Sequence, residues 1–444
     1  MHFTARCRQF FLAAALLPLC ASASADTLKK DIQTDYDKHL GALFEHFHRN
    51  PELSTMENKT AARLAEELRD TGFEVTEGVG GTGIVALMEN GPGPLVMMRA
   101  DMDGLPVEEK SGLSYASRAK QNDWNDNEVF VMHACGHDVH ITSLVGTARR
   151  MANMRDHWSG TLMLIGQPAE EAIGGAKMMM DDGVWKRFGQ PDYAMAFHVS
   201  SNLASGKLMA VEGSPYSGVD SVDLLIHGVG GHGASPHTTV DPVVLGSQIV
   251  VALQTVISRT LAPREPGVIT VGSFHAGTKH NIISDQAKLQ ITVRNESEQT
   301  RKLLLDGIRR ISENLGRAAG LPEDKLPEVR VRESDNYPPT LNDIPLTRRL
   351  RGVWTSALGD DILVDEKRKG MGAEDFPFFV TDPYIPSTYF AVGGTPEADF
   401  ERARNGGAPV PSHHSPIFKV EPEAAVNLGV HATVLALIDL MPPK

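Results

Sequence analysis

A short stretch of the chain, HACGHDVHIT at residues 133–142, places one thiol among three imidazoles. Cys135 and His137 stand two residues apart, so both side chains can face one metal ion or a pair of ions. With a carboxylate and another imidazole they would form an N/S/O site that suits zinc and also admits other late first-row ions. The alternative, a buried structural cysteine, is disfavoured by the flanking His and Asp residues. We therefore predict that Cys135 is a metal ligand.

Two adjacent carboxylates, Glu170 and Glu171, follow in the segment GQPAEE. On a tight loop they point in different directions, so one can bind a metal while the other stays free beside a metal-activated water. A metal lowers the pKa of such a water towards about 7, and a neighbouring glutamate can take its proton during attack. A solvated acidic pair at a helix start is the alternative, because negative charge is favoured there.

The elements that must position these residues alternate between apolar strands and helices from residue 27 to about 212. Buried strands between helices indicate a mostly parallel sheet that is covered on both faces. Sites in such sheets form outside the carboxyl ends of the strands. Three predicted strands run into candidate groups there, so we expect these groups to converge: Asp101 and Asp103, Glu170 and Glu171, and His198. The pair His413–His414 lies at a later strand-to-helix turn.

From residue 214 to 332 the pattern changes to β-α-β-β-α-β, which is the order of a ferredoxin-like sandwich. The first pattern resumes afterwards, so this segment is expected to be an insertion. The predicted fold is therefore an α/β, mostly parallel-sheet domain (residues 26–213 and 333–444) that carries an inserted α+β domain. Gly-rich GVGGHG and the junctions near 213 and 333 would let the inserted domain move as a lid.

The composition excludes some classes of partner. The formal net charge is −13 and there is no basic stretch, which argues against binding nucleic acid or an anionic membrane. We also expect no segment after the first 25 residues to be long and apolar enough to enter a bilayer. A chain of this length exceeds the usual single core, so two domains are the default.

The first 25 residues are typical of an export signal, with Arg6 and Arg8, an apolar run over 10–19, and small residues before Asp26. We predict an exported, periplasmic or secreted protein. Cleavage would remove Cys7 and Cys20, which leaves Cys135 without a disulfide partner. A lipid anchor at Cys20 is the alternative, and the bulky residue before it disfavours that signal.

The combined motifs resemble those of the M20 metallopeptidase family. The segments RADMDGLP, HACGHD, GQPAEE, AFHV, GGHGASPH, NIIS, GMGAEDF and HHSPIF occur in that family's order and cover essentially the whole mature chain. They are most similar to its amidohydrolase branch, which includes hippurate hydrolases, N-acyl-amino-acid hydrolases and auxin-conjugate hydrolases. The resemblance implies a metal-dependent hydrolase that cleaves the amide bond of an N-acyl amino acid or short peptide, and a homodimer formed through the inserted domain.

The same resemblance implies roles for individual residues. Two divalent ions, zinc first and manganese, cobalt or nickel as alternatives, would be held by Cys135, His137, Glu171, His198 and His414, with Cys135 as the bridge. Glu170 matches the general base and Asp103 a supporting carboxylate. His232 matches the histidine that supports the scissile carbonyl, often from the other subunit, and Asn281 and Arg294 fall at substrate contacts.

Other residues favour plainer interpretations, and some positions depart from the family. His133 and His140 are expected to support the ligands or pack on a helix face, His237 to satisfy a loop, and Glu374 and Asp375 to shape the site. Ser284 stands where the family commonly has proline, and HVSSN replaces a segment like HVWP. These positions border the substrate cleft. A carboxypeptidase or dipeptidase, and more remotely a non-catalytic metal- or peptide-binding protein, are therefore the alternative functions.

Overall fold

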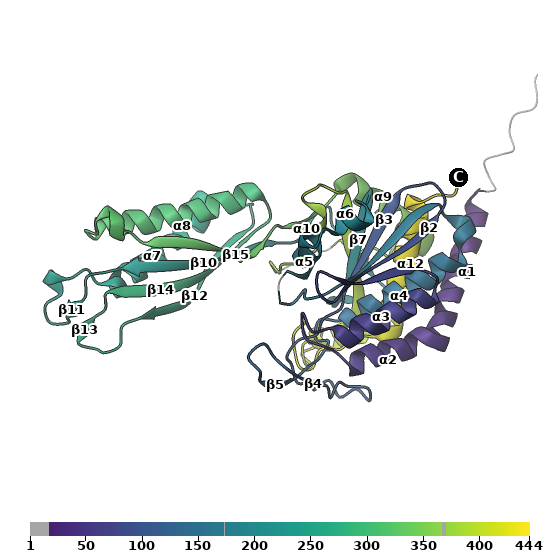
Figure 1. The fold of residues 1–444 in the computed structure, drawn as a ribbon, viewed down its shortest axis with the longest axis horizontal. Coiled ribbons are helices and arrows are strands. Elements are labelled where there is room, and N and C mark those ends of the chain that lie inside the picture. The colour runs from purple at the N-terminus through teal and green to yellow at the C-terminus, as the bar shows by residue number, and fades with distance from the viewer. Residues whose placement is uncertain (1–16, 173, 366–369) are drawn as a thin grey trace, which may run out of the picture.

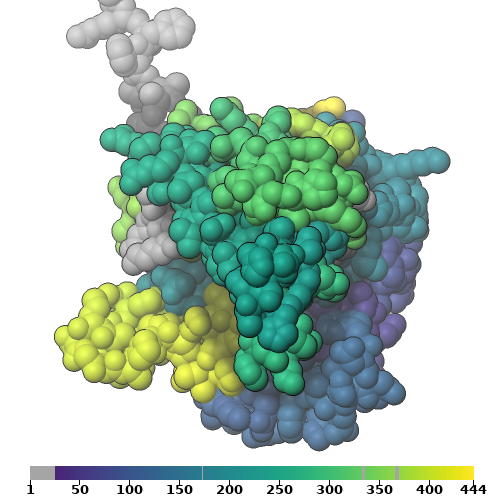
Figure 2. All heavy atoms as spheres, turned by 90° about the vertical axis from the view of Figure 1, so that its left-hand side faces the viewer, coloured from purple at the N-terminus to yellow at the C-terminus, as the bar shows by residue number. Residues whose placement is uncertain are grey.

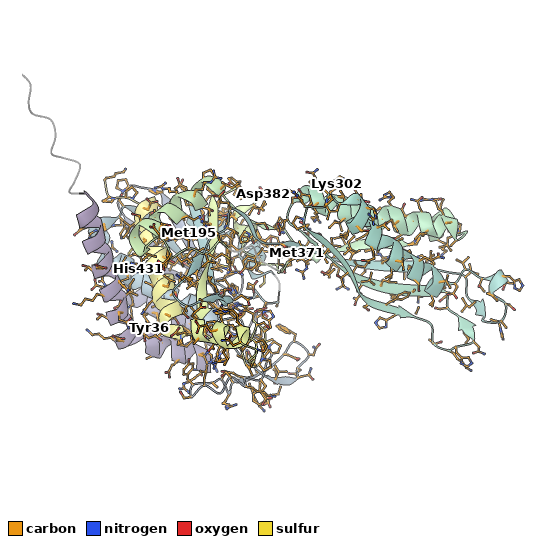
Figure 3. The ribbon with its side chains drawn as sticks, turned by 180° about the vertical axis from the view of Figure 1, so that it is seen from behind. Tyr36, Met195, Lys302, Met371, Asp382 and His431 are labelled. Carbon is orange, nitrogen blue, oxygen red and sulfur yellow. The ribbon has the colours of Figure 1, made fainter. Side chains whose placement is uncertain are left out.

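The computed structural model describes residues 17–172, 174–365 and 370–444, so the predicted signal segment lies outside the described part up to residue 16. Figure 1 shows a larger lobe, built from both ends of the chain, and an elongated insert that projects from it. Seen from behind, Asp382 lies on the larger lobe and Lys302 at the end of the insert nearest to it (Figure 3).

The larger lobe is built on a seven-stranded sheet. Its strands, in spatial order, are β1 (Glu74–Val79), β2 (Gly83–Asn90), β6 (Gly160–Gln167), β3 (Leu95–Asp101), β7 (Tyr193–Ala204), β17 (Ser387–Thr395) and β8 (Leu208–Met209). The four strands from β6 to β17 run parallel to one another, and β1, β2 and β8 add antiparallel edges. The carboxyl ends of the parallel strands therefore lie at one edge of the sheet.

Helices cover both faces of this sheet. Successive residues of a strand point to opposite faces, and in these strands both sets are largely apolar, so each face needs a cover. One face packs against α1 (Leu17–Asp35), α2 (Gly41–Arg49), α3 (Asn58–Asp70), α4 (His137–Asn153), α9 (Ile344–Leu358) and α12 (Pro422–Leu440). The other packs against α5 (Gly175–Asp181), α6 (Val184–Phe188) and α10 (Pro377–Val380). Short elements complete the lobe: the β4 (Lys120–Asn122) and β5 (Glu128–Phe130) hairpin, β9 (Gly213–Tyr216) paired with β16 (Thr340–Asn342), and α11 (Glu397–Arg404).

The insert follows the predicted β-α-β-β-α-β order. Its elements are β10 (Gly218–His227), α7 (Pro242–Thr255), β12 (Gly267–Ala276), β14 (Gln286–Asn295), α8 (Glu298–Ala318) and β15 (Glu328–Tyr337). The four strands form an antiparallel sheet in the order β12-β14-β10-β15, and the two helices share its buried core. A small sheet of β11 (Gly231–His232) and β13 (Ile282–Ile283) forms the tip. The predicted fold class, including the separate inserted sheet, is confirmed.

The expectation that no later segment is long and apolar enough to cross a membrane was wrong on that criterion. Among the described residues, Pro242–Thr260 and Pro422–Leu440 both meet it by length and composition. Polar residues such as Ser247 and Asn427 interrupt both runs, which is why the sequence pattern understated their apolar character. In α12, 61% of the apolar window is buried, as in a core helix, whereas the window that begins in α7 is only 28% buried.

Candidate metal centre

The loop before α4 brings Cys135 to the carboxyl edge of the sheet. Gly136 has a left-handed φ of 85°, and a Cβ there would lie 2.4 Å from a methyl carbon of Val199, so only glycine lets this loop pass β7. The Cys135 Sγ lies 3.4 Å from the Nε2 of His198, and the thiol is buried. Burial, followed by the charges on Glu171 and Glu170, raises the pKa of Cys135 well above its usual value. A thiolate at this position therefore needs a cation beside it.

The five predicted metal ligands come together in two groups that share Cys135. The donor atoms of Cys135, His137 and His198 lie within 4.8 Å of one another, and so do those of Cys135, Glu171 and His414. The first group comes from α4, its preceding loop and β7, and the second adds the loop after β6 and the turn before α12. Three donors in each group, with one sulfur common to both, is the arrangement expected for a pair of ions.

The sequence pattern predicted His198 just past the end of a strand. In the structure it lies within β7. The strand runs on because β17 continues to pair with it beyond that point. The Nδ1 of His198 is 2.6 Å from the carbonyl oxygen of Val199, so this nitrogen donates to the backbone and Nε2 faces Cys135. The backbone therefore sets which nitrogen is free to bind a metal.

Carboxylates hold His137 from one side. Its Nδ1 lies 3.2 Å from Asp103 Oδ1, while its Nε2 lies 3.8 Å from Asp101 Oδ2 and 4.0 Å from Glu170 Oε2. Burial would lower the pKa of His137, but the charges on Asp101 and Asp103 raise it to about 10. Within the described part of the chain the Nε2 of His137 makes no hydrogen bond, and Glu171 Oε1 lies 3.1 Å from the Nε2 of the predicted ligand His414. Buried polar atoms of this kind need partners, and divalent cations would supply them.

His140 supports the site without belonging to either group. Its Nδ1 donates to Asp101 Oδ1 at 2.5 Å, and its Nε2 accepts the Val199 N–H at 2.9 Å. These contacts define a neutral ring, and burial lowers its pKa. His140 thus ties α4 to β3 and to β7 next to His198, as its predicted supporting role requires. His133 is also buried, and in the described residues neither of its nitrogens has a hydrogen-bond partner.

Glu170, the other carboxylate of the adjacent pair, is outside the two groups that share Cys135, although its carboxylate also lies within 4.8 Å of donor atoms of His137 and Glu171. It lies beside His137 on one side and within 4.8 Å of Glu374 and Asp375 on the other. Burial, followed by the charge on Glu374, raises the pKa of Glu170 well above its usual value. A carboxylate with raised proton affinity beside the ligands can take up and return a proton. Glu374 and Asp375 thus border Glu170, and that they shape the site rather than bind metal stays a prediction.

Sequence reasoning missed the buried arginine side chain that pairs with these carboxylates. Arg99 in β3 is fully buried and donates to Asp101 at 2.6 Å, to Glu374 at 2.7 Å and to Gln167 at 2.7 Å. Burial would raise the pKa of Asp101, but Arg99 holds it well below its usual value. The signal was present, since an arginine inside the apolar run PLVMMRA must find buried anions. Sequence reasoning also missed Glu57, a buried carboxylate before α3.

The comparisons with known proteins agree with this geometry. The model of peptidase family M20/M25/M40 matches residues 97–406. The chain belongs to this family. It is 36% identical over 417 residues to thermostable carboxypeptidase 2 of Saccharolobus solfataricus, covering 93% of this chain and 98% of that protein. It is 34% identical over 350 residues to the hippurate hydrolase of Campylobacter jejuni, covering 79% of this chain and 86% of that one.

A solved structure supports the same family assignment. The chain resembles a dinuclear metal-binding peptidase of the M20 family from Bacillus subtilis with a TM-score of 0.75 and 25% identity, over 94% of this chain and 100% of the other. The protein is therefore a hydrolase of the M20 family, as the ordered motifs indicated.

The M20 chain does not bring its own His232 and Asn281 to the metal centre. Both are exposed at the tip, where Gly233 N–H donates to the Asn281 carbonyl oxygen at 2.9 Å. The ten residues of β10 separate this tip from the junction with the larger lobe, a length of about 30 Å. Arg294 lies at the opposite end of β14, paired with Val219 near the junction. The exposed His237 lies at the tip as well.

Proposed function

We propose that this protein hydrolyses the amide bond of N-acyl amino acids with Glu170 as the general base. The observation that carries the proposal is the pair of donor groups sharing Cys135, with a free carboxylate beside them. The hippurate hydrolase among its relatives supports this substrate class. The chain keeps every ligand and the base, which disfavours a non-catalytic binding protein.

The donor set fits divalent cations, since it combines sulfur, imidazole and carboxylate with a buried nitrogen, Nε2 of His137, that makes no hydrogen bond in the described part of the chain. Zinc suits these ligands best, with manganese, cobalt or nickel as alternatives. Bound cations supply Lewis-acid chemistry, which lowers the pKa of water and polarises a carbonyl oxygen. Cys135, His137 and His198 would hold one cation, and Cys135, Glu171 and His414 the other.

The chain's own groups then handle the proton. Glu170 accepts a proton from the attacking water at a carboxylate oxygen and delivers it to the leaving nitrogen. Its raised pKa favours holding that proton between the two steps. Asp103 fixes the ring of His137 at 3.2 Å, so the ligand cannot turn away. The buried Glu374 and Asp375 lie on the far side of Glu170, and the charge on Glu374 adds to its proton affinity.

A second chain would complete the site. His232 and Asn281 lie at the tip of the insert, and α7 beside them exposes Val243, Val244 and Val251. From residue 242 to 258 this helix and its extension carry no charged residue. An exposed, uncharged helix face of this kind marks an association surface. We infer a homodimer in which the partner's tip reaches this chain's metals and supports the oxyanion, with Arg294 contacting the substrate.

The alternative function is a carboxypeptidase or dipeptidase, which the 36% identity to a thermostable carboxypeptidase favours. Elemental analysis of the purified protein, followed by assay on N-acetyl and N-benzoyl amino acids and on free dipeptides, separates the two. Faster turnover of the acylated substrates supports our proposal. Turnover of free peptides alone would establish the alternative, and cleavage of neither by metal-loaded protein would reject both.

The place of action is also a proposal. The signal-like first 25 residues support export to the periplasm or outside the cell, with cleavage before Asp26. Mass spectrometry of protein secreted by the native host tests this: a mature chain starting at residue 26 is expected. A chain that keeps its leader, or that carries lipid on Cys20, would contradict it.

A further inference from the structure

A buried carboxylate outside the metal ligands holds the loop that carries Glu170. Glu57 lies just before α3 and is completely buried. Its Oε1 accepts the Thr55 N–H at 2.9 Å and the Ala169 N–H at 2.7 Å, and its Oε2 accepts the Thr82 hydroxyl at 2.5 Å. The contact with Ala169 spans 112 residues of sequence, so it joins two separate segments of the larger lobe.

The residue that Glu57 holds has an unfavourable backbone conformation. Ala169 has a φ of 49°, in the left-handed region that residues with a Cβ seldom occupy. Such a conformation persists only where the surrounding structure imposes it. Ala169 immediately precedes Glu170, so its backbone angles set the direction in which the Glu170 side chain leaves the loop.

The amide on the other side of Glu170 is held in the same way. Glu171 N–H donates to Asp103 Oδ2 at 2.9 Å, and the same oxygen accepts the Ser54 hydroxyl at 2.6 Å. The two peptide N–H groups that flank Glu170 are therefore each bound by a buried carboxylate. The segment from Ser54 to Glu57 connects both contacts.

We propose that Glu57 is a positioning residue for hydrolysis: by holding the Ala169 N–H it fixes the left-handed turn that aims Glu170 at the metal centre. This inference rests on the proposed function, in which Glu170 is the base. It assigns a mechanistic task to the PELSTME segment, which contributes no metal ligand.

The contacts do not require a charge on Glu57. Burial, with the charge on Asp103 adding to it, raises its pKa to about 7. A glutamine oxygen could accept both backbone N–H groups, as Oε1 of Glu57 does. Its amide nitrogen could donate to the Thr82 hydroxyl, because a hydroxyl oxygen accepts as well as donates. Glu57→Gln should therefore keep the loop in place, whereas Glu57→Ala removes all three contacts.

Steady-state kinetics of the metal-loaded protein test the positioning role of Glu57. We expect Glu57→Ala to lower kcat by about 10²-fold, because Glu170 would be misplaced and misplacement of a reacting group has a cost of this size. KM should stay within about threefold of wild type, and the bound metal should not change. Glu57→Gln should keep kcat within about threefold. Glu52→Ala is the matched control, since Glu52 lies in the same segment but its carboxylate accepts from Lys59 and Thr60 at the start of α3.

A second variant tests the path through Ala169. Glycine adopts a positive φ without strain, so Ala169→Gly in the Glu57→Ala background should recover at least about tenfold of the lost kcat. No recovery, or equal losses in Glu57→Ala and Glu52→Ala, would overturn the proposal. If Glu57→Ala does not fold, Glu57→Asp replaces it, because its shorter side chain cannot reach Thr55 and Ala169 together.

Hydrogen exchange separates failure of this inference from failure of the proposed function. If wild-type protein cleaves no acyl-amino-acid substrate, the proposed function fails. The hold of Glu57 on the Ala169 N–H can still be measured. The Ala169 amide should be protected in wild type and Glu57→Gln and should exchange at least about tenfold faster in Glu57→Ala, with Glu52→Ala unchanged. Equal exchange of this amide in all four proteins would show that Glu57 does not hold the Ala169 N–H.

Discussion

The metal centre and the tip of the insert place their functional residues in opposite physical settings. At the centre, Cys135, His137 and His198 are buried, and short hydrogen bonds join Asp101 to His140 and His140 to the backbone N–H of Val199 next to His198. At the tip, His232 and Asn281 are exposed, and the described contacts there are local to the tip itself. The centre is preorganised by its own chain, whereas the tip gains surroundings only when another body covers it.

This contrast separates what one chain can do from what two chains do together. Preorganisation of ligands and base is a property of folding, because every contact that holds them is intramolecular. The proposed support of the oxyanion by His232 would depend on association and on the angle between the insert and the larger lobe. Figure 2 looks along the molecule from the tip of the insert, with the larger lobe behind it.

Replacing the base tests the centre most severely. Glu170→Gln should lower kcat by about 10³-fold, because it removes the group that moves the proton, while the bound metal stays at the wild-type level. Stopped assays and elemental analysis measure the two. Glu171→Gln is the contrasting variant, because it should lose metal as well as activity. Normal turnover in metal-loaded Glu170→Gln would show that another group is the base.

Mixing two inactive variants tests whether the tip acts on the other chain. His232→Ala should lower kcat by about 10²-fold, the usual cost of removing one oxyanion donor. When it is mixed with Glu170→Gln and the subunits exchange, mixed dimers contain one site with an intact base and an intact partner histidine. Activity should therefore appear in the mixture. If the mixture is no more active than its components, His232 does not act across the dimer.

The sequence predicted the centre more completely than the tip for a physical reason. Strand ends and a helix start predict that Cys135 and Glu171 lie at the same edge of the sheet, because the carboxyl ends of parallel strands meet there. Local periodicity says nothing about which surface covers His232. It also missed Arg99 and Glu57, each of which has one partner more than a hundred residues away, Glu374 and Ala169 respectively. Buried charges in apolar or loop segments demand partners, but sequence alone does not say which ones.

The pH dependence of stability should also distinguish the two regions. In the larger lobe, buried His48 pairs with Asp138 at 2.6 Å and with Glu109 at 3.2 Å. Burial opposes the charge, but these two carboxylates raise the pKa of His48 to about 9. Because this lies above the unfolded value of about 6.5, the stabilisation is fully present below pH 6.5 and is lost as the pH rises through 9. The change amounts to about 3 kcal/mol.

Urea unfolding between pH 6 and 9.5 measures this loss, with fluorescence of Trp158 and Trp354 reporting on the larger lobe. His48→Gln provides the comparison, since its unfolding free energy should fall by about 3 kcal/mol less than that of the wild type over the same window. Parallel pH curves for the two proteins would mean that the ring is not charged in the folded state.

The smallest expected shift is in the association constant of the proposed dimer. Val244→Asp with Val251→Asp would place charges on the exposed apolar face of α7, where removing them from water costs free energy that no partner offsets. Sedimentation equilibrium should show a dimer dissociation constant raised by at least about tenfold. Lys302→Asp on α8 (Figure 3) makes a similar charge change on the other helix and should leave association unchanged.

Because dissociation removes the partner's tip and leaves every metal ligand in place, the dissociated variant should keep its metal and lose turnover as His232→Ala does. A dissociated chain with wild-type kcat would mean that the metal centre works alone and that the tip has another task.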